Sequence, residues 1–142
     1  MSAYVKWGKK FELEIEEIDA QHKKWIEILN RFVEAREQGK EARILNDVLK
    51  EIVDYTRYHF DTEEKHMKEN DYALLEEHKQ QHAILIKQVA EIIRTINVSE
   101  TKAILSLEMV LKNWVLKHIL TYDKMYGEFL KKKRKEKLSA NS

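Results

Sequence analysis

The chain has 142 residues, of which 43% are hydrophobic and 36% are charged, and its formal net charge is +1. This length favours a single domain over residues 1–142, and the composition is typical of a globular rather than a disordered protein. The absence of cysteine excludes disulfides, thiolate nucleophiles and iron–sulfur clusters, and the near-neutral charge indicates neither a nucleic-acid nor a membrane partner.

Residues that break helices are scarce, because the sequence holds 3 glycines and no proline. Such a chain should consist mainly of long helices, so we expect an all-α fold. Its apolar runs are shorter than the roughly 18 residues that cross a bilayer. Met1 to Phe11 do not have the pattern of a secretory signal. A cytoplasmic protein is therefore expected.

Residues 1–18 are expected to form an N-terminal arm that packs through Trp7, Phe11, Leu13, Ile15 and Ile18. A first helix should follow from about Asp19 to Glu37, because its apolar residues form one helical stripe: Trp25, Ile28, Leu29, Phe32 and Val33. Gly39 predicts the end of this helix.

A second helix is expected from about Glu41 to Glu69, with its inward face formed by Ile44, Leu45, Val48, Leu49, Ile52, Val53 and Tyr55. Asn70 and Asp71 predict a turn. A third helix should run from about Tyr72 to Ile96, with the apolar residues Leu75, Ala83, Leu85, Ile86, Val89, Ile92 and Ile93.

Ser99 is expected to cap a fourth helix that runs from about Glu100 past Leu130, with the apolar residues Ile104, Leu107, Val110, Leu111, Trp114 and Val115. Short turns make consecutive helices alternate in direction, which predicts an up-down-up-down four-helix bundle. Residues 131–142 form a basic C-terminal tail. We interpret the tail as a solvated helix end, with a basic contact site as the alternative.

Every expected helix carries at least one of the six histidines. His78 and His82 lie four residues apart, about 40° in azimuth and about 6 Å along a helix axis, so both rings can reach one ion. His59 and Glu63 repeat this spacing. An unpaired buried imidazole costs on the order of 1–3 kcal/mol. A single metal centre would satisfy all five histidines that lie on the inward faces of the four helices, so we interpret them as metal ligands.

The candidate ligands are His22, His59, Glu63, His78, His82, His118 and one residue after His118. Seven ligands exceed the about four to six that one ion takes, which suggests two ions with bridging carboxylates. Tyr122 follows His118 by four residues. Asp123 follows by five, about 140° around an ideal helix, and would need a local distortion such as a π-type turn. Spacing leaves both open, and the donor set suits iron, zinc, copper or manganese.

These residues resemble the hemerythrin family, and in particular its single-domain bacterial members, the bacteriohemerythrins. Four segments carry the resemblance, which covers about residues 4–126: Ile18-Asp19-Ala20-Gln21-His22, His59-Phe60-Asp61-Thr62-Glu63-Glu64, His78-Lys79-Gln80-Gln81-His82 and Trp114 to Asp123.

The resemblance implies two iron ions. One would be held by His78, His82 and His118, and the other by His22 and His59 with one position open. Glu63, Asp123 and an oxo or hydroxo group would bridge them, so the resemblance favours Asp123 over Tyr122.

The implied function is reversible dioxygen binding at a non-haem di-iron centre, for oxygen transport, storage or delivery to an O2-consuming protein partner. The implied O2 pocket consists of Trp25, Phe60, Trp114, Val115 and Ile119. The protein is expected to be a monomer or a small homo-oligomer and not an enzyme, apart from a weak peroxidase-like side activity.

The alternatives are a di-iron oxidase or peroxidase and an O2- or iron-sensing module. Ferritin-like oxidases use two Glu-x-x-His motifs, whereas this chain has one, at Glu63 and His66. Five neutral imidazoles also leave little anionic charge on the metal, which favours binding over oxidation. Residues 131–142 leave no room for a sensor's output domain.

Four residues depart from the family pattern. Trp25, His66 and Val115 stand where leucine is usual, and Ala73 stands where proline is usual. Trp25 either narrows the O2 pocket or faces another part of the core, and the smaller Val115 can compensate its volume. His66 is expected to be partly exposed or to support a ligand, and Ala73 to lengthen the third helix at its start.

Overall fold

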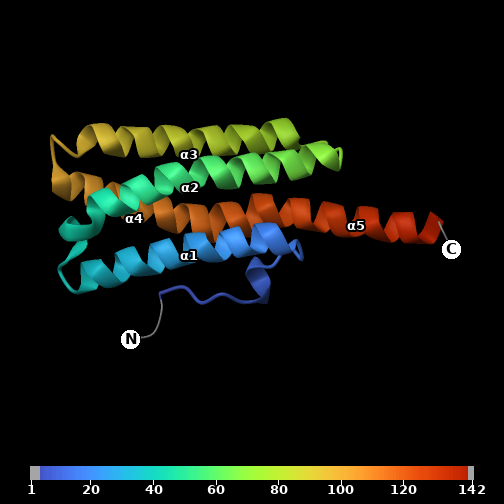
Figure 1. Ribbon diagram of the computed structural model, residues 1–142, viewed down its shortest axis with the longest axis horizontal. Coiled ribbons are helices and arrows are strands. Elements are labelled where there is room, and N and C mark those ends of the chain that lie inside the picture. Colours follow the sequence, from blue (N-terminus) through green and yellow to red (C-terminus); the bar gives the residue numbers. More distant parts are fainter. Residues whose placement is uncertain (1–3, 141–142) are drawn as a thin grey trace.

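The computed structural model describes residues 4–140, and every regular element in that range is a helix (Figure 1). The short 3-10 helix η1, Lys9–Phe11, lies in the N-terminal arm. The longer elements follow it: α1 Glu16–Glu37, α2 Glu41–Glu69, α3 Leu75–Thr95, α4 Glu100–Asn113, the π-helix η2 Trp114–Asp123 and α5 Lys124–Ala140. The last three continue one another as a single long helix. The expected all-α, up-down-up-down four-helix bundle is therefore confirmed.

Several helix ends follow from the residues that were expected to set them. Gly39 adopts a φ of 70°, a left-handed conformation that suits glycine, and α1 ends just before it. The Oγ of Ser99 accepts a hydrogen bond from the amide of Lys102 at 3.2 Å and caps α4. The bounds of α2 agree with the prediction.

Helix α1 begins at Glu16, three residues earlier than expected, so the arm ends at Ile15 rather than at residue 18. The Asp19 carboxylate accepts hydrogen bonds from the amides of Leu13 (2.8 Å) and Glu14 (3.1 Å), which fasten the arm to the first turn of α1. Leu13 also packs on Gly127 of α5, where an added Cβ would lie 3.1 Å from the Cγ of Leu13. Residues 1–3 of the expected arm and 141–142 of the expected tail lie outside the described residues.

Helix α3 begins at Leu75, so the expectation that it starts at Tyr72 and is lengthened by Ala73 is wrong. The amide of Tyr72 donates to the carbonyl of Met67 at 3.0 Å, which closes a turn after α2. The Tyr72 ring is buried, with its centroid 4.9 Å from that of Tyr126. These contacts hold Tyr72 outside the helix.

Four of the apolar residues named for the second and third helices are exposed: Val53, which was expected on the inward face, and Ala83, Ile86 and Ile93. The apolar stripes of α2 and α3 are wider than the contact between the helices requires, because Leu85, Val89 and Ile92 already fill the inner face of α3. Val53, Ile86 and Ile93 line a shallow cavity of about 440 Å³ between the two helices.

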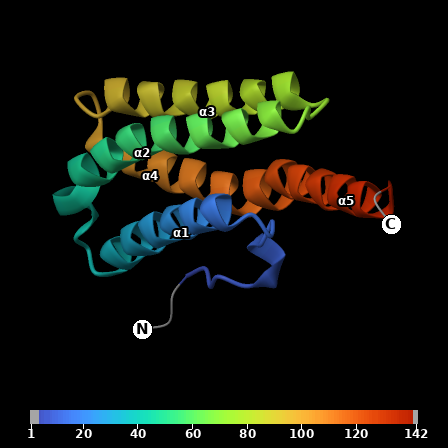
Figure 2. The ribbon, with the colours of Figure 1, turned by 45° about the vertical axis from the view of Figure 1, so that its right-hand side comes forward.

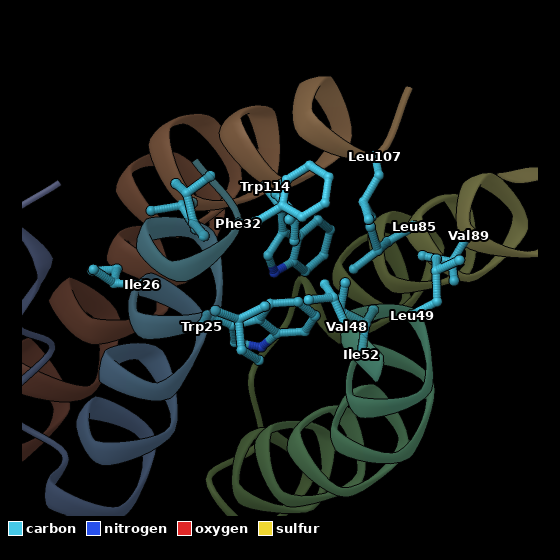
Figure 3. Close-up of a cluster of buried hydrophobic side chains, with 14 of the residues drawn as sticks. Trp25, Ile26, Phe32, Val48, Leu49, Ile52, Leu85, Val89, Leu107 and Trp114 are labelled. Carbon is cyan, nitrogen blue, oxygen red and sulfur yellow. The ribbon is translucent and has the colours of Figure 1, made fainter. Parts of the chain in front are cut away.

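The buried side chains form two apolar clusters at different levels of the bundle. The larger one contains Trp25, Val48 and Leu107, whose side chains gather between the helices in Figure 3. The smaller one joins the arm to α5 through Leu13, Ile15, Ile18, Met67, Tyr72, Tyr126 and Leu130. Along each long helix, the candidate ligands fall between members of the two clusters, so a polar layer lies between two apolar ones.

Helix α5 projects past the ends of α2 and α3, as Figures 1 and 2 show. Its basic residues Lys131, Lys132 and Lys135 are exposed on this projection. Among the described residues, no helix has both the length and the apolar character needed to cross a membrane.

Candidate metal centre

The structure brings all seven predicted ligands together in the buried polar layer. Their ligand atoms form two groups within which every atom lies less than 4.8 Å from the others: Glu63, His78, His82, His118 and Asp123 in the first, and His22, His59, Glu63 and Asp123 in the second. Each of the seven side chains is buried. Glu63 and Asp123 belong to both groups, so the two groups share their carboxylates.

The two oxygens of each shared carboxylate point to different groups. For Glu63, Oε1 lies 2.6 Å from Nε2 of His78 and 3.0 Å from Nε2 of His82, whereas Oε2 lies 3.3 Å from Nε2 of both His22 and His59. For Asp123, Oδ1 approaches His78 (2.8 Å), and Oδ2 approaches His22 (3.0 Å). This arrangement is the one that two bridging carboxylates would need.

Asp123 reaches the cluster because the helix around it is a π-helix. Its Oδ1 lies 3.1 Å from Nε2 of His118, five residues earlier, a separation that would point away from His118 in a regular α-helix. The half-buried Tyr122 stacks on the His118 ring instead, with ring centroids 5.4 Å apart. The expected π-type distortion is therefore present, and it brings Asp123 rather than Tyr122 into the cluster.

Several buried polar atoms of the cluster lie close to a facing nitrogen or oxygen but make no aligned hydrogen bond: Nε2 of His59, Nε2 of His118 and both carboxylate oxygens of Asp123. Each such atom costs on the order of 1–3 kcal/mol when it is left without a partner. Imidazole nitrogens and carboxylate oxygens are ligands of first-row transition metals. These buried atoms therefore suit a metal ion, because the ion would be coordinated by nitrogen and oxygen lone pairs that accept no aligned hydrogen bond.

Gln21 fixes the orientation of His59. The hydroxyl of Thr62 donates to the carbonyl of Tyr58 at 2.9 Å, so its oxygen accepts from Nε2 of Gln21 at 3.3 Å. The Oε1 of Gln21 then faces His59 and accepts a hydrogen bond from Nδ1 at 2.7 Å. With its proton on Nδ1, His59 keeps the lone pair of Nε2 available to a metal ion in the cluster.

Glu64 plays the same part for His82. Its Oε2 lies 2.7 Å from Nδ1 of His82, while Nε2 of this ring faces Glu63. Gln21, Thr62 and Glu64 were not predicted from the sequence as supports of the site. A signal for Gln21 existed, because this polar residue precedes Trp25 by four positions on the buried stripe of α1.

Burial and charge act in opposite directions on the histidines of the cluster. Burial opposes protonation of His22 and His78, but Asp123 and Glu63 outweigh it and raise the pKa of His22 to about 9 and that of His78 to about 10. Burial prevails at His59 and His118 and lowers their pKa values. Burial alone would raise the pKa of Glu63, yet the facing histidines hold it well below its usual value.

Apolar side chains enclose the cluster, and all five residues of the expected pocket are buried: Trp25, Phe60, Trp114, Val115 and Ile119. The Phe60 ring stacks on His82 with centroids 3.8 Å apart, and Trp114 stacks on His118 at 3.6 Å. The Trp25 ring meets His59 edge-on with centroids 6.4 Å apart and also belongs to the larger apolar cluster, so it borders both the ligands and the core. Its indole nitrogen is buried without a hydrogen-bond partner.

Comparison with known proteins identifies relatives over most of the chain. Residues 13–130 match the family model described as "Hemerythrin HHE cation binding domain". Proteins named bacteriohemerythrin are 33% identical in Stenotrophomonas maltophilia (91% of this chain, 83% of the relative) and 33% identical in Pseudomonas aeruginosa (87% and 80%). A third, from Clostridium acetobutylicum, is 32% identical over 84% of this chain and 96% of its own length.

Proposed function

The chain belongs to the hemerythrin family of non-haem iron-binding domains, and we propose from this membership that it binds dioxygen reversibly at a di-iron centre. The observation that carries the proposal is the division of the Glu63 and Asp123 oxygens between two groups of histidine nitrogens. We further propose that residues 1–142 form one domain, which acts in oxygen transport, storage or delivery to an O2-consuming protein.

Each ion would have its own set of histidines. His78, His82 and His118 would hold one ion, and His22 and His59 would hold the other, with Glu63, Asp123 and an oxo or hydroxo group as bridges. The second set has one histidine fewer. Dioxygen would therefore bind on the side of His22 and His59, where a coordination position remains for it.

When bound, the iron pair supplies the electrons that hold dioxygen. The chain supplies the surroundings. Gln21 and Glu64 keep the Nε2 atoms of His59 and His82 directed at the ions, which limits rearrangement of the ligands. The buried rings of Trp25, Phe60 and Trp114 exclude water, and with it the protons that would displace the bound ligand.

A binding protein is favoured over a di-iron oxidase by the position of His66. The one Glu-x-x-His motif, at Glu63 and His66, would resemble an oxidase only if both residues were ligands. The His66 side chain contacts Tyr126 instead and belongs to neither ligand group. A weak peroxidase-like side activity remains part of the proposal.

Visible absorption tests the proposed function. The iron-bound protein is reduced under nitrogen, exposed to air and then returned to nitrogen. A charge-transfer band that appears in air and disappears after O2 removal is the expected result. A band that persists would indicate oxidation to the ferric form instead of reversible binding. The absence of any band would rule out a coupled di-iron centre.

A further inference from the structure

His66 and Tyr126 form a contact beside the cluster of candidate metal ligands. His66 follows Glu63 by three residues on α2, and Tyr126 follows Asp123 by three residues at the start of α5. Each is thus displaced by about 4.5 Å along its helix from a shared carboxylate. The hydroxyl of Tyr126 is hydrogen-bonded to Nδ1 of His66, and the Tyr126 side chain is fully buried.

The hydrogen-bond partners indicate where the proton of this contact lies. Nδ2 of Asn70, which can only donate, lies 3.5 Å from Nδ1 of His66 and donates to the His66 carbonyl at 2.8 Å. Partial burial, together with the nearby Arg134, lowers the pKa of His66, so its ring is neutral at pH 7. Nδ1 of His66 is therefore an acceptor, and the Tyr126 hydroxyl has two acceptors within reach, this nitrogen and the His66 carbonyl at 3.1 Å.

Among residues 4–139, Tyr126 is the one tyrosine whose hydroxyl is hydrogen-bonded to a histidine nitrogen. Tyr55 also lies beside the cluster, but its hydroxyl donates to the backbone carbonyl of Gln21 at 3.1 Å. An amide carbonyl does not take up a proton near neutral pH, whereas a neutral imidazole does. A phenol loses an electron far more readily when a base can accept its proton in the same step.

We propose that Tyr126 and His66 form an oxidisable pair that supplies one electron when hydrogen peroxide reaches the metal centre. This proposal rests on the proposed function, because it requires iron in the cluster. It gives a role to His66, which lies outside both ligand groups.

The electrons and protons of this reaction balance. Reduction of one peroxide to two water molecules takes two electrons and two protons. A centre with one ferrous ion left gives one electron, and Tyr126 gives the other. The Oη–H bond of Tyr126 breaks, an Nδ1–H bond forms on His66, and solvent supplies both protons. The products are a ferric ion, a neutral tyrosyl radical, a protonated His66 and two water molecules.

The pair would protect the bundle from oxidative damage. A single ferrous electron would reduce peroxide only to hydroxide and a hydroxyl radical, which attacks neighbouring side chains. Tyr126 supplies the second electron from a position that Tyr72 and Phe129 shield from solvent, with ring centroids 4.9 Å and 6.1 Å away. The buried Met67 belongs to the same apolar cluster and is a nearby side chain open to such damage.

Electron paramagnetic resonance tests the proposal. Iron-bound protein with one ferrous ion per centre is mixed with one equivalent of hydrogen peroxide and frozen rapidly. The unaltered protein should give a tyrosyl radical signal, and Tyr126→Phe, which keeps the ring and removes the hydroxyl, should lose it. Tyr72→Phe, a neighbouring buried tyrosine, is the matched control and should keep the signal.

His66→Gln tests the base separately, because glutamine can accept the hydrogen bond of Tyr126 but cannot take its proton. Loss of the radical and increased oxidation of Met67, measured by mass spectrometry, are expected. A radical that persists in Tyr126→Phe, or at full yield in His66→Gln, overturns the proposal. An O2-dependent band without any radical overturns it while the proposed function stands, and the absence of both overturns the two together.

Discussion

Oε1 of Gln21 lies 2.7 Å from Nδ1 of His59, and this contact decides which ring nitrogen of His59 faces the carboxylates. We expect Gln21→Ala to release the ring and to weaken metal binding by about 10–100-fold, the range typical of residues that orient a ligand. Competition with a chelator measures the effect. The exposed Gln80→Ala is the control. Equal metal retention in both variants would contradict the role of Gln21.

Asp123 and Tyr122 can be separated by substitution. Asp123→Asn removes the charge of a shared carboxylate and should reduce metal affinity more than the about 10–100-fold expected of a supporting residue. Tyr122→Phe should leave the metal content unchanged, because only the Tyr122 ring contacts His118. Elemental analysis of the two purified variants measures their metal content. Loss of metal in Tyr122→Phe but not in Asp123→Asn would show that the ligand is Tyr122.

Trp25 should limit the access of dioxygen under the proposed function, since its fully buried ring lies 6.4 Å from that of His59, where dioxygen is proposed to bind. Trp25→Leu is expected to speed O2 association and to cost about 2 kcal/mol of stability through the space left behind. Stopped-flow mixing measures association and dissociation. Trp7→Leu, in the N-terminal arm, should leave both rates unchanged. Unchanged O2 association and dissociation rates in Trp25→Leu would contradict a role of Trp25 in the access of dioxygen.

The stability of the metal-free protein should fall as the pH rises from 6.5 to about 10. The ordinary histidine pKa is 6.5, and the folded values for His22 and His78 are raised to about 9 and about 10. The folded state thus binds these protons more tightly than the unfolded state. The stabilisation is complete below pH 6.5 and is lost as pH rises through the folded values, by a total on the order of a few kcal/mol.

Urea unfolding of the metal-free protein between pH 6 and about 10.5 measures this loss as a fall in the midpoint concentration. Replacing His22 by glutamine should flatten the pH profile. A midpoint that rises over this range would contradict the assigned pKa directions. The same protons must leave before metal binds, so metal uptake should strengthen over the same range.

The ends of helices were predicted correctly from the sequence where a single residue determines where the helix begins or ends. Gly39 and Ser99 are examples, because a left-handed conformation and a side-chain cap are local properties. The start of α3 was missed because Tyr72 is held by long-range contacts with Met67 and Tyr126. The exposure of Ile86 and Ile93 was missed because hydrophobicity gives the width of a stripe but not the width of the contact that covers it.

The seven clustered residues could be named from the sequence, but for two different reasons. The spacing of His78 and His82 predicts a shared partner by helix geometry alone. For Asp123, geometry predicted only that a distortion would be needed, and the family resemblance decided against Tyr122. Gln21 and Glu64 were not found because their role depends on a neighbouring helix: Gln21 of α1 supports a ring on α2, and Glu64 of α2 supports a ring on α3.

The π-helix Trp114–Asp123 also accommodates one residue more than regular α-helical turns would need over the same stretch. Deleting Thr121 would place Asp123 four residues after His118, the spacing at which α-helical turns bring two side chains to one face. The wide turn absorbs the extra residue, so Tyr126 and Leu130 keep the face on which Leu13 and Ile15 dock. The docking of the arm should therefore tolerate the loss of this one residue when the helix returns to α-helical turns.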